Sequence, residues 1–99
     1  MGFFNNLFKT TSNADLSEII ANGGLLLDVR TKSEYTGGHA NGSKNIPLDQ
    51  LAANLSKLDK TKPIVAVCAS GMRSGSAVSL LKSKGFSEVY NGGSWTKYM

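Results

Sequence analysis

Apolar residues in this chain fall into two patterns, short continuous runs and runs at helical spacing. The clearest continuous run covers residues 63–67, where β-branched residues predict a strand buried on both faces. A second run at 25–30 begins with three leucines and ends in charged residues, which predicts another short buried strand. Shorter apolar stretches at 43–46, stopped by Pro47, and at 88–90 predict two further strands, and Gly92 and Gly93 are expected to turn the chain after the last of them.

Four segments between these runs carry the helical pattern. A helix is predicted from Asn13, with Asn13 or Asp15 as its cap and Gly23-Gly24 as its end. One helical turn is predicted at 31–35, and a longer helix at 49–58. A last helix is predicted at 74–84, ended by Gly85. The expected inner faces are Leu16, Ile19 and Ile20; Leu51, Leu55 and Leu58; and Ala77, Val78 and Leu81.

Alternation of short apolar strands with helices predicts an α/β fold in which helices cover both faces of a parallel sheet. The 99 residues suffice for one domain, expected at 13–99, with residues 1–12 as an N-terminal extension. In that extension Phe3, Phe4, Leu7 and Phe8 are at helical spacing, so we expect them to pack onto the domain. Chemistry in such folds lies beyond the carboxyl ends of the strands.

Composition and charge exclude several classes of function. The net charge of +4 comes from scattered lysines without interleaved aromatics, which does not indicate a nucleic-acid groove. The apolar runs are too short for a membrane span, and the first residues lack the pattern of a signal peptide, so we expect a cytoplasmic protein. Cys68 is the only cysteine and His39 the only histidine, which excludes an intrachain disulfide and the usual zinc motifs.

The segment from Cys68 to Ser74 joins the best predicted strand to the best predicted helix. Gly71 allows a backbone conformation in which successive N–H groups point inward, and the following helix adds its own unpaired N–H groups. Because such a cradle favours an anion, the pKa of a thiol at its mouth should be lowered. With Arg73 five positions after Cys68, the segment predicts an activated cysteine that faces an anionic substrate.

Several stretches together resemble a rhodanese-homology domain, in the expected order and over residues 15–95. They are 26–31, 34–35, 38–39, 42–48, the active-site loop 68–74, 85–93 and Trp95. The resemblance implies a three-layer α/β sandwich with a small, mostly parallel central sheet flanked by helices. It also implies sulfur transfer through a cysteine persulfide, without a metal or an organic cofactor.

On that resemblance Cys68 takes a sulfur from a small anionic donor such as thiosulfate and passes it to cyanide or a thiol, including a thiol on a carrier protein. Arg73 is expected to bind the donor's oxyanion. The other loop residues are expected to bind the substrate or persulfide: Ala69, Ser70, Gly71, Met72 and Ser74.

Four further residues are expected to support the site rather than to react. Arg30 is predicted to pair with Glu34, and Asp28 to accept hydrogen bonds from backbone N–H groups. His39 is expected to fix the geometry of its loop, because a thiolate held by N–H groups needs no general base. Trp95 is expected to fill the core.

Two other classes of function are compatible with the sequence. Some domains of this family are regulatory, sulfur-carrying or docking modules, although those commonly lack the cysteine that this chain has. Tyrosine phosphatases and arsenate reductases use a similar loop, but with the arginine six residues after the cysteine. Here Ser74 occupies that position, and the shorter loop is suited to a single sulfur atom.

Overall fold

The computed structural model describes residues 12–99, whose centre is a sheet of four parallel strands in the order β2-β1-β3-β4. The strands are β1 (Leu25–Asp28), β2 (Lys44–Asn45), β3 (Ile64–Cys68) and β4 (Val89–Ser94). Residue Leu27 pairs with Lys44 on one side and with Ala66 on the other. The predicted α/β fold with a parallel sheet is confirmed, and β3 is an inner strand.

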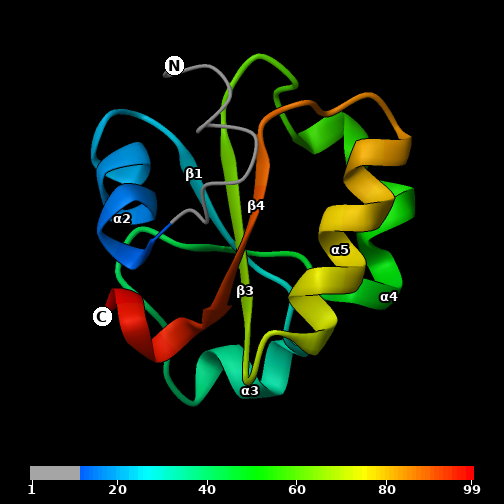
Figure 1. Ribbon diagram of the computed structural model, residues 1–99. Helices are drawn as coiled ribbons and strands as arrows, with labels where there is room; N and C mark the ends of the chain where they lie inside the picture. Colours follow the sequence, from blue (N-terminus) through cyan, green and yellow to red (C-terminus); the bar gives the residue numbers. More distant parts are fainter. Residues whose placement is uncertain (1–11) are drawn as a thin grey trace.

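Helices cover both faces of this sheet and make the structure a three-layer sandwich (Figure 1). The helices are α2 (Asn13–Ala21), α3 (Lys32–Thr36), α4 (Leu48–Leu51) and α5 (Met72–Ser83), with 3-10 helices η1 (Ala52–Lys57) and η2 (Trp95–Tyr98). Figure 1 shows α2 and η2 on one side of the sheet and α4 and α5 on the other. The carboxyl ends of β3 and β4 point toward the end of the molecule where α3 lies.

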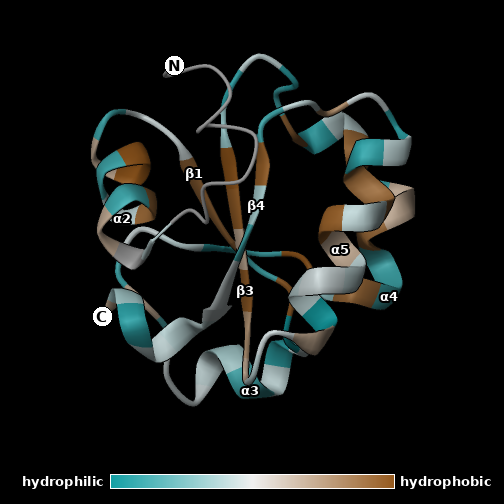
Figure 2. Cartoon of the chain, in the orientation of Figure 1, coloured by the Kyte–Doolittle hydropathy of each residue, from teal (hydrophilic) through white to brown (hydrophobic). Residues whose placement is uncertain are grey.

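Two hydrophobic clusters fill the spaces between these layers, and the strands between them are the apolar centre of the fold (Figure 2). Leu27 and Ala66 point into the cluster beneath α4 and α5, whereas Leu26, Val65 and Val67 point into the cluster beneath α2 and η2. Strand β3 is therefore buried along its whole length. This explains why its sequence is apolar throughout instead of alternating.

Two helices begin with capping boxes. Ser12 caps α2: its hydroxyl accepts from the backbone N–H of Asp15, whose side chain accepts from the N–H of Ser12 in return. The predicted caps Asn13 and Asp15 are therefore wrong by one to three positions, since both lie inside the helix. Thr31 and Glu34 form the same arrangement at the start of α3.

The helix predicted at 49–58 is in fact two shorter pieces, α4 and η1. Asn54 has φ of −120°, outside the helical range, and its side chain donates to the carbonyl of Gln50 at 2.7 Å. The inner positions still face the core, with Leu51 and Leu58 buried and Leu55 partly so. Hydrophobic spacing predicted the buried face correctly but not the kink, because a 3-10 turn can present nearly the same residues inward.

Strand β4 continues through the glycines that were predicted to turn the chain. The register shifts between Ala66, which pairs with Asn91, and Val67, which pairs with Gly93. A Cβ at Gly92 would lie 2.8 Å from Val65 Cγ1, so only a glycine fits at this point against the sheet. The two glycines therefore form a bulge within the strand rather than its end.

Two further expectations concern the N-terminal extension and membrane-spanning helices. The predicted turn at Phe3–Phe8 lies outside the described residues. Within residues 12–99, no helix combines the length and the apolar character that crossing a membrane requires.

Candidate active site

Cys68 is the last residue of β3, and its side chain lies at the carboxyl end of an inner strand. The residue is 1% exposed. The chain then makes a tight loop and enters α5 at Met72, two positions before the helix start predicted at residue 74. Gly71 precedes the helix with φ of +107°, in the left-handed region that favours glycine. This conformation turns the loop back toward the sulfur atom.

Three groups surround Cys68 Sγ. The N–H of Gly71 donates to it at 3.0 Å and the N–H of Ser74 at 3.3 Å, while Ser74 Oγ lies 3.4 Å away. Burial raises the pKa of the thiol, but hydrogen bonds from the Ser74 side chain and from the backbone N–H groups of Ser74, Gly71 and Ser70 outweigh it and lower the pKa to about 7. Near neutral pH a large fraction of Cys68 is therefore the nucleophilic thiolate.

Arg73 points from α5 to α3, where it forms a two-pronged ion pair with Glu34. Its Nη1 lies 2.7 Å from Glu34 Oε1, and its Nη2 lies 3.0 Å from Oε2. The Arg73 guanidinium is the largest cause that lowers the pKa of Glu34, to about 2. The predicted ion pair of Arg30 with Glu34 is therefore wrong, because the Glu34 carboxylate binds Arg73 and Arg30 reaches only the backbone carbonyl of Glu34, at 3.3 Å.

Arg30 instead binds Asp28 behind the site, and both residues are buried. Nε and Nη2 of Arg30 lie 2.8–3.0 Å from the Asp28 carboxylate oxygens, and Asp28 also accepts from the Arg30 backbone N–H. The guanidinium further donates to the carbonyl of Gly38 at 2.6 Å and lies over the ring of Trp95 at 4.4 Å. This arrangement ties the end of β1 to the turn after α3 and to Trp95 near the end of the chain.

His39 interacts with Tyr35, four residues earlier. Its ring stacks on the Tyr35 ring with centroids 3.8 Å apart, and its Nδ1 lies 2.8 Å from the Tyr35 carbonyl oxygen. The ring itself is exposed. These contacts hold the turn after α3 in place. They are made with Tyr35 and not with the residues that surround Cys68.

Asn91 of β4 is a site residue that the sequence reasoning missed. Its side chain contacts Ser74, Gly71 and Gly93, so it touches two of the residues that surround the sulfur. The available signal was its position directly after the strand predicted at 88–90, because chemistry in such folds lies beyond the carboxyl ends of the strands.

Residues of the loop line two open hollows of about 310 Å³ each. One is lined in part by Ser70, Met72 and Lys97, and Met72 is 82% exposed there. The other is lined in part by Arg73 and Leu48. Ala69 and Ser70 are exposed as well, so the loop presents its outer side to solvent while the N–H groups of Gly71 and Ser74 face the sulfur.

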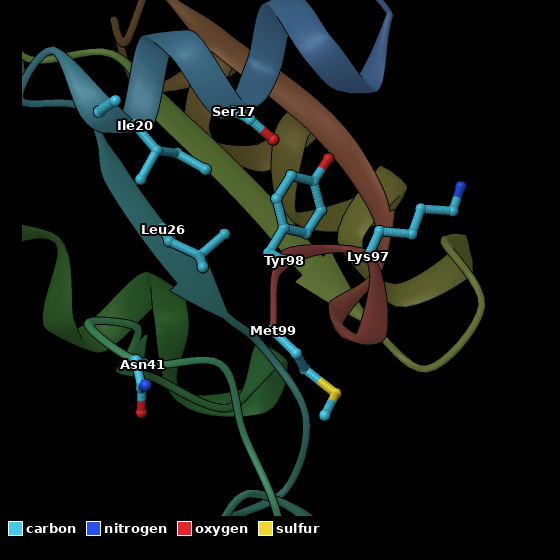
Figure 3. A pocket seen from close by; sticks show the side chains of 8 residues that line it. Ser17, Ile20, Leu26, Asn41, Lys97, Tyr98 and Met99 are labelled. Carbon is cyan, nitrogen blue, oxygen red and sulfur yellow. The ribbon is translucent and has the colours of Figure 1, made fainter.

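A hollow of about 260 Å³ lies elsewhere, between α2 and η2 (Figure 3). Ile20, Leu26 and Tyr98 line it, and it is not bordered by the Cys68 loop. Among residues 12–99, no three His, Cys, Asp or Glu side chains lie close enough together to form a metal site.

Comparison with known proteins agrees with this geometry. The family model of the Rhodanese-like domain matches residues 12–99. YqhL of Bacillus subtilis is 41% identical over 66 residues, which are 67% of this chain and 52% of that protein, so the match spans about half of YqhL. Thiosulfate sulfurtransferase GlpE of Ectopseudomonas mendocina is 32% identical over 85% of this chain and 77% of its own. A rhodanese-like domain protein from Staphylococcus aureus superposes with a TM-score of 0.75 at 28% identity, over 88% of this chain and 87% of that one.

Proposed function

The chain belongs to the Rhodanese-like domain family, and from that premise we propose that it moves a sulfane sulfur from thiosulfate, or a similar anionic donor, to a thiol or cyanide through a persulfide on Cys68. Relatives named thiosulfate sulfurtransferase support a sulfurtransferase-type function. The observation that carries the proposal is the set of donors converging on Cys68 Sγ: two N–H groups within 3.3 Å and the hydroxyl of Ser74 at 3.4 Å.

The first half of the reaction needs a thiolate, and the lowered pKa of Cys68, about 7, supplies it. The thiolate attacks the outer sulfur of thiosulfate, a new S–S bond forms, and the S–S bond of the donor breaks with its electron pair leaving on sulfite. The negative charge then lies on the outer sulfur of the persulfide. The N–H groups of the loop 69–74 are the donors available to stabilise it.

The second half regenerates the enzyme. A thiolate or cyanide attacks the outer sulfur, the bond to Cys68 Sγ breaks, and the Cys68 thiolate leaves. The same hydrogen bonds that lower the pKa make it a good leaving group. No oxidant or reductant is consumed, because the sulfane sulfur moves between two nucleophiles.

Arg73 is the proposed binding group for the anionic donor. A guanidinium has five N–H donors, and Glu34 takes two of them in the structure, so others are available to an oxyanion. The ion pair also fixes the direction of the Arg73 side chain at the start of α5. Donor binding would then add hydrogen bonds without requiring the side chain to reorient.

Intact mass spectrometry after treatment with thiosulfate tests the proposal. We expect a gain of one sulfur, about 32 Da, which cyanide removes. Cys68→Ser is the matched control, because it replaces the sulfur with a hydroxyl of similar shape and should show no gain. A folded protein that forms no adduct would contradict the proposal and favour a docking module, whereas hydrolysis of a phosphate monoester by the same protein would favour phosphatase chemistry.

A further inference from the structure

Asn91 has a side-chain orientation that its neighbours fix. Its Nδ2 donates to the carbonyl of Gly71 at 2.9 Å, and its Oδ1 accepts from the backbone N–H of Gly93 at 3.0 Å. A reversed amide would place a donor against the N–H of Gly93 and an acceptor against the carbonyl of Gly71. The Oδ1 atom therefore faces Ser74 as an acceptor, at 2.7 Å from its hydroxyl oxygen.

The hydroxyl of Ser74 has a single proton and two neighbours that can accept it. One is Asn91 Oδ1 at 2.7 Å, and the other is Cys68 Sγ at 3.4 Å. Ser74 is fully buried, so these neighbours dominate the surroundings of its hydroxyl. While Cys68 is a neutral thiol, its S–H can donate to Ser74 Oγ, which leaves the Ser74 proton for Asn91. Once Cys68 is a thiolate it can only accept, so the sulfur and Asn91 Oδ1 are rival acceptors for the one hydroxyl proton.

We propose that Asn91 is a positioning residue that competes with the Cys68 thiolate for the hydroxyl proton of Ser74, and so makes this hydrogen bond respond to charge on the sulfur. This inference rests on the proposed function. During sulfur transfer the charge lies on Sγ when Cys68 attacks and when it leaves, and Ser74 then donates to Sγ. In the persulfide the charge is on the outer sulfur, and Ser74 donates to Asn91. The hydroxyl only rotates, so no proton is transferred.

The charged groups around the loop do not change in the experiment below. Arg73 of α5 lies near the thiolate and is paired with Glu34 of α3. Asp28 of β1 is paired with Arg30 behind the site. Lys97 of η2 borders the outer side of the loop together with Ser70. Their contributions to the pKa of Cys68 are the same in each variant and cancel in the comparison.

The test is the pKa of Cys68 in four proteins: wild type, Asn91→Ala, Ser74→Ala and the double variant. Since Cys68 is the only cysteine, the ultraviolet absorbance of its thiolate against pH reports it directly, without sulfur transfer. Asn91→Ala also frees the Gly71 carbonyl, but this effect is the same with serine or alanine at position 74. The change in the pKa of Cys68 caused by Asn91→Ala is therefore compared between the Ser74 and Ser74→Ala proteins, and the difference isolates the competition for the hydroxyl.

We expect Asn91→Ala to bring the pKa of Cys68 down further when Ser74 is present than when position 74 is alanine. The expected difference between the two backgrounds is about half a pKa unit to one unit, or about threefold to tenfold in the thiolate-to-thiol ratio. Equal pKa changes in the two backgrounds, or a pKa that is raised more with Ser74 present, would overturn the proposal and leave Asn91 with the role of holding Gly71 in place. Asn91→Asp gives a second measurement: a carboxylate is the stronger acceptor, so the difference between the two backgrounds should change sign. Asn41→Ala, an exposed asparagine outside the site, should leave the pKa unchanged.

Failure of the proposed function has a different signature. If thiosulfate adds no sulfur to the wild type while the pKa difference is found, the competition for the hydroxyl stands and sulfur transfer does not. If the adduct forms and the pKa shifts are equal, the proposed function stands and the role of Asn91 does not.

Discussion

Arg73 and Glu34 are 39 positions apart in the sequence, yet they form a two-pronged ion pair at 2.7 and 3.0 Å that joins the first turn of α5 to α3. The same carboxylate accepts from the backbone N–H of Thr31 at 3.1 Å and so caps α3. Glu34 thus holds Arg73 beside the Cys68 loop while its own position is fixed by the start of a helix.

Glu34→Gln should make the stability of the protein less dependent on acidic pH. The folded pKa of Glu34 is about 2, below its ordinary value of 4.5, because Arg73 and the Thr31 N–H favour the carboxylate. The stabilisation is therefore complete above pH 4.5 and is lost as the pH falls toward 2. Urea unfolding at several pH values should show this loss in the wild type and not in the variant. Parallel pH profiles for the two proteins would contradict it.

Arg73→Ala should raise the KM for thiosulfate about tenfold or more while affecting an uncharged sulfur donor much less, because a charge-assisted hydrogen bond is lost only with the anion. Persulfide formation measured against donor concentration gives both values. Arg73→Lys retains the charge but not the two-pronged guanidinium, so its KM for thiosulfate should lie between those of the wild type and Arg73→Ala. Equal losses with both donors would show that Arg73 supports the loop and does not bind the donor.

The rate of alkylation of Cys68 should rise with pH around a midpoint of about 7, because the thiolate is the reactive form. The unfolded chain has the ordinary value of 9.0, so between pH 7 and 9 the unfolded state binds more protons and stability rises with pH. Cys68→Ser should lack this rise in unfolding experiments. An alkylation midpoint near 9 would show that the N–H groups around the sulfur do not act on its pKa.

Gly71→Ala should raise the pKa of Cys68 and lower stability by about 1–2 kcal/mol, because alanine is strained at φ of +107° and the Gly71 N–H would move away from the sulfur. Gly23→Ala is the matched control, since Gly23 has φ of +106° with open space around it. The control should be destabilised to a similar extent with the pKa of Cys68 unchanged. A similar change of pKa in both variants would contradict the role given to Gly71.

Asp28→Asn should destabilise the protein by about 3–5 kcal/mol, because it leaves the buried guanidinium of Arg30 without its counter-charge. Thermal or urea unfolding measures the loss. Asp49→Asn, at an exposed carboxylate, should change the stability by less than about 0.5 kcal/mol. A loss at position 28 as small as this would show that the Gly38 carbonyl and the Trp95 ring suffice to hold Arg30.

The sequence predicted the elements whose signals are local. An uninterrupted apolar run rich in β-branched residues identified β3, and helical spacing identified α5, with Ala77 and Leu81 buried as expected. The motif from Cys68 to Arg73 identified the loop because a short turn before a helix has few alternative geometries. At η1 and at the glycines of β4, more than one backbone conformation keeps the same residues facing inward. The sequence therefore did not predict the kink at Asn54 or the bulge in β4.

The sequence by itself determined the succession of strands and helices along the chain, most residues of the core and the loop that carries Cys68. Each of these depends on neighbours within a few positions. Only the tertiary structure decided the partners of the charged and polar groups. Arg73 could have paired with any nearby carboxylate, and the fold brings Glu34 to it while Asp28 is taken by Arg30. Likewise, the pairing of β4 with β3 places Asn91 against Ser74. Such contacts depend on distances set by the packed sheet, which no local pattern encodes.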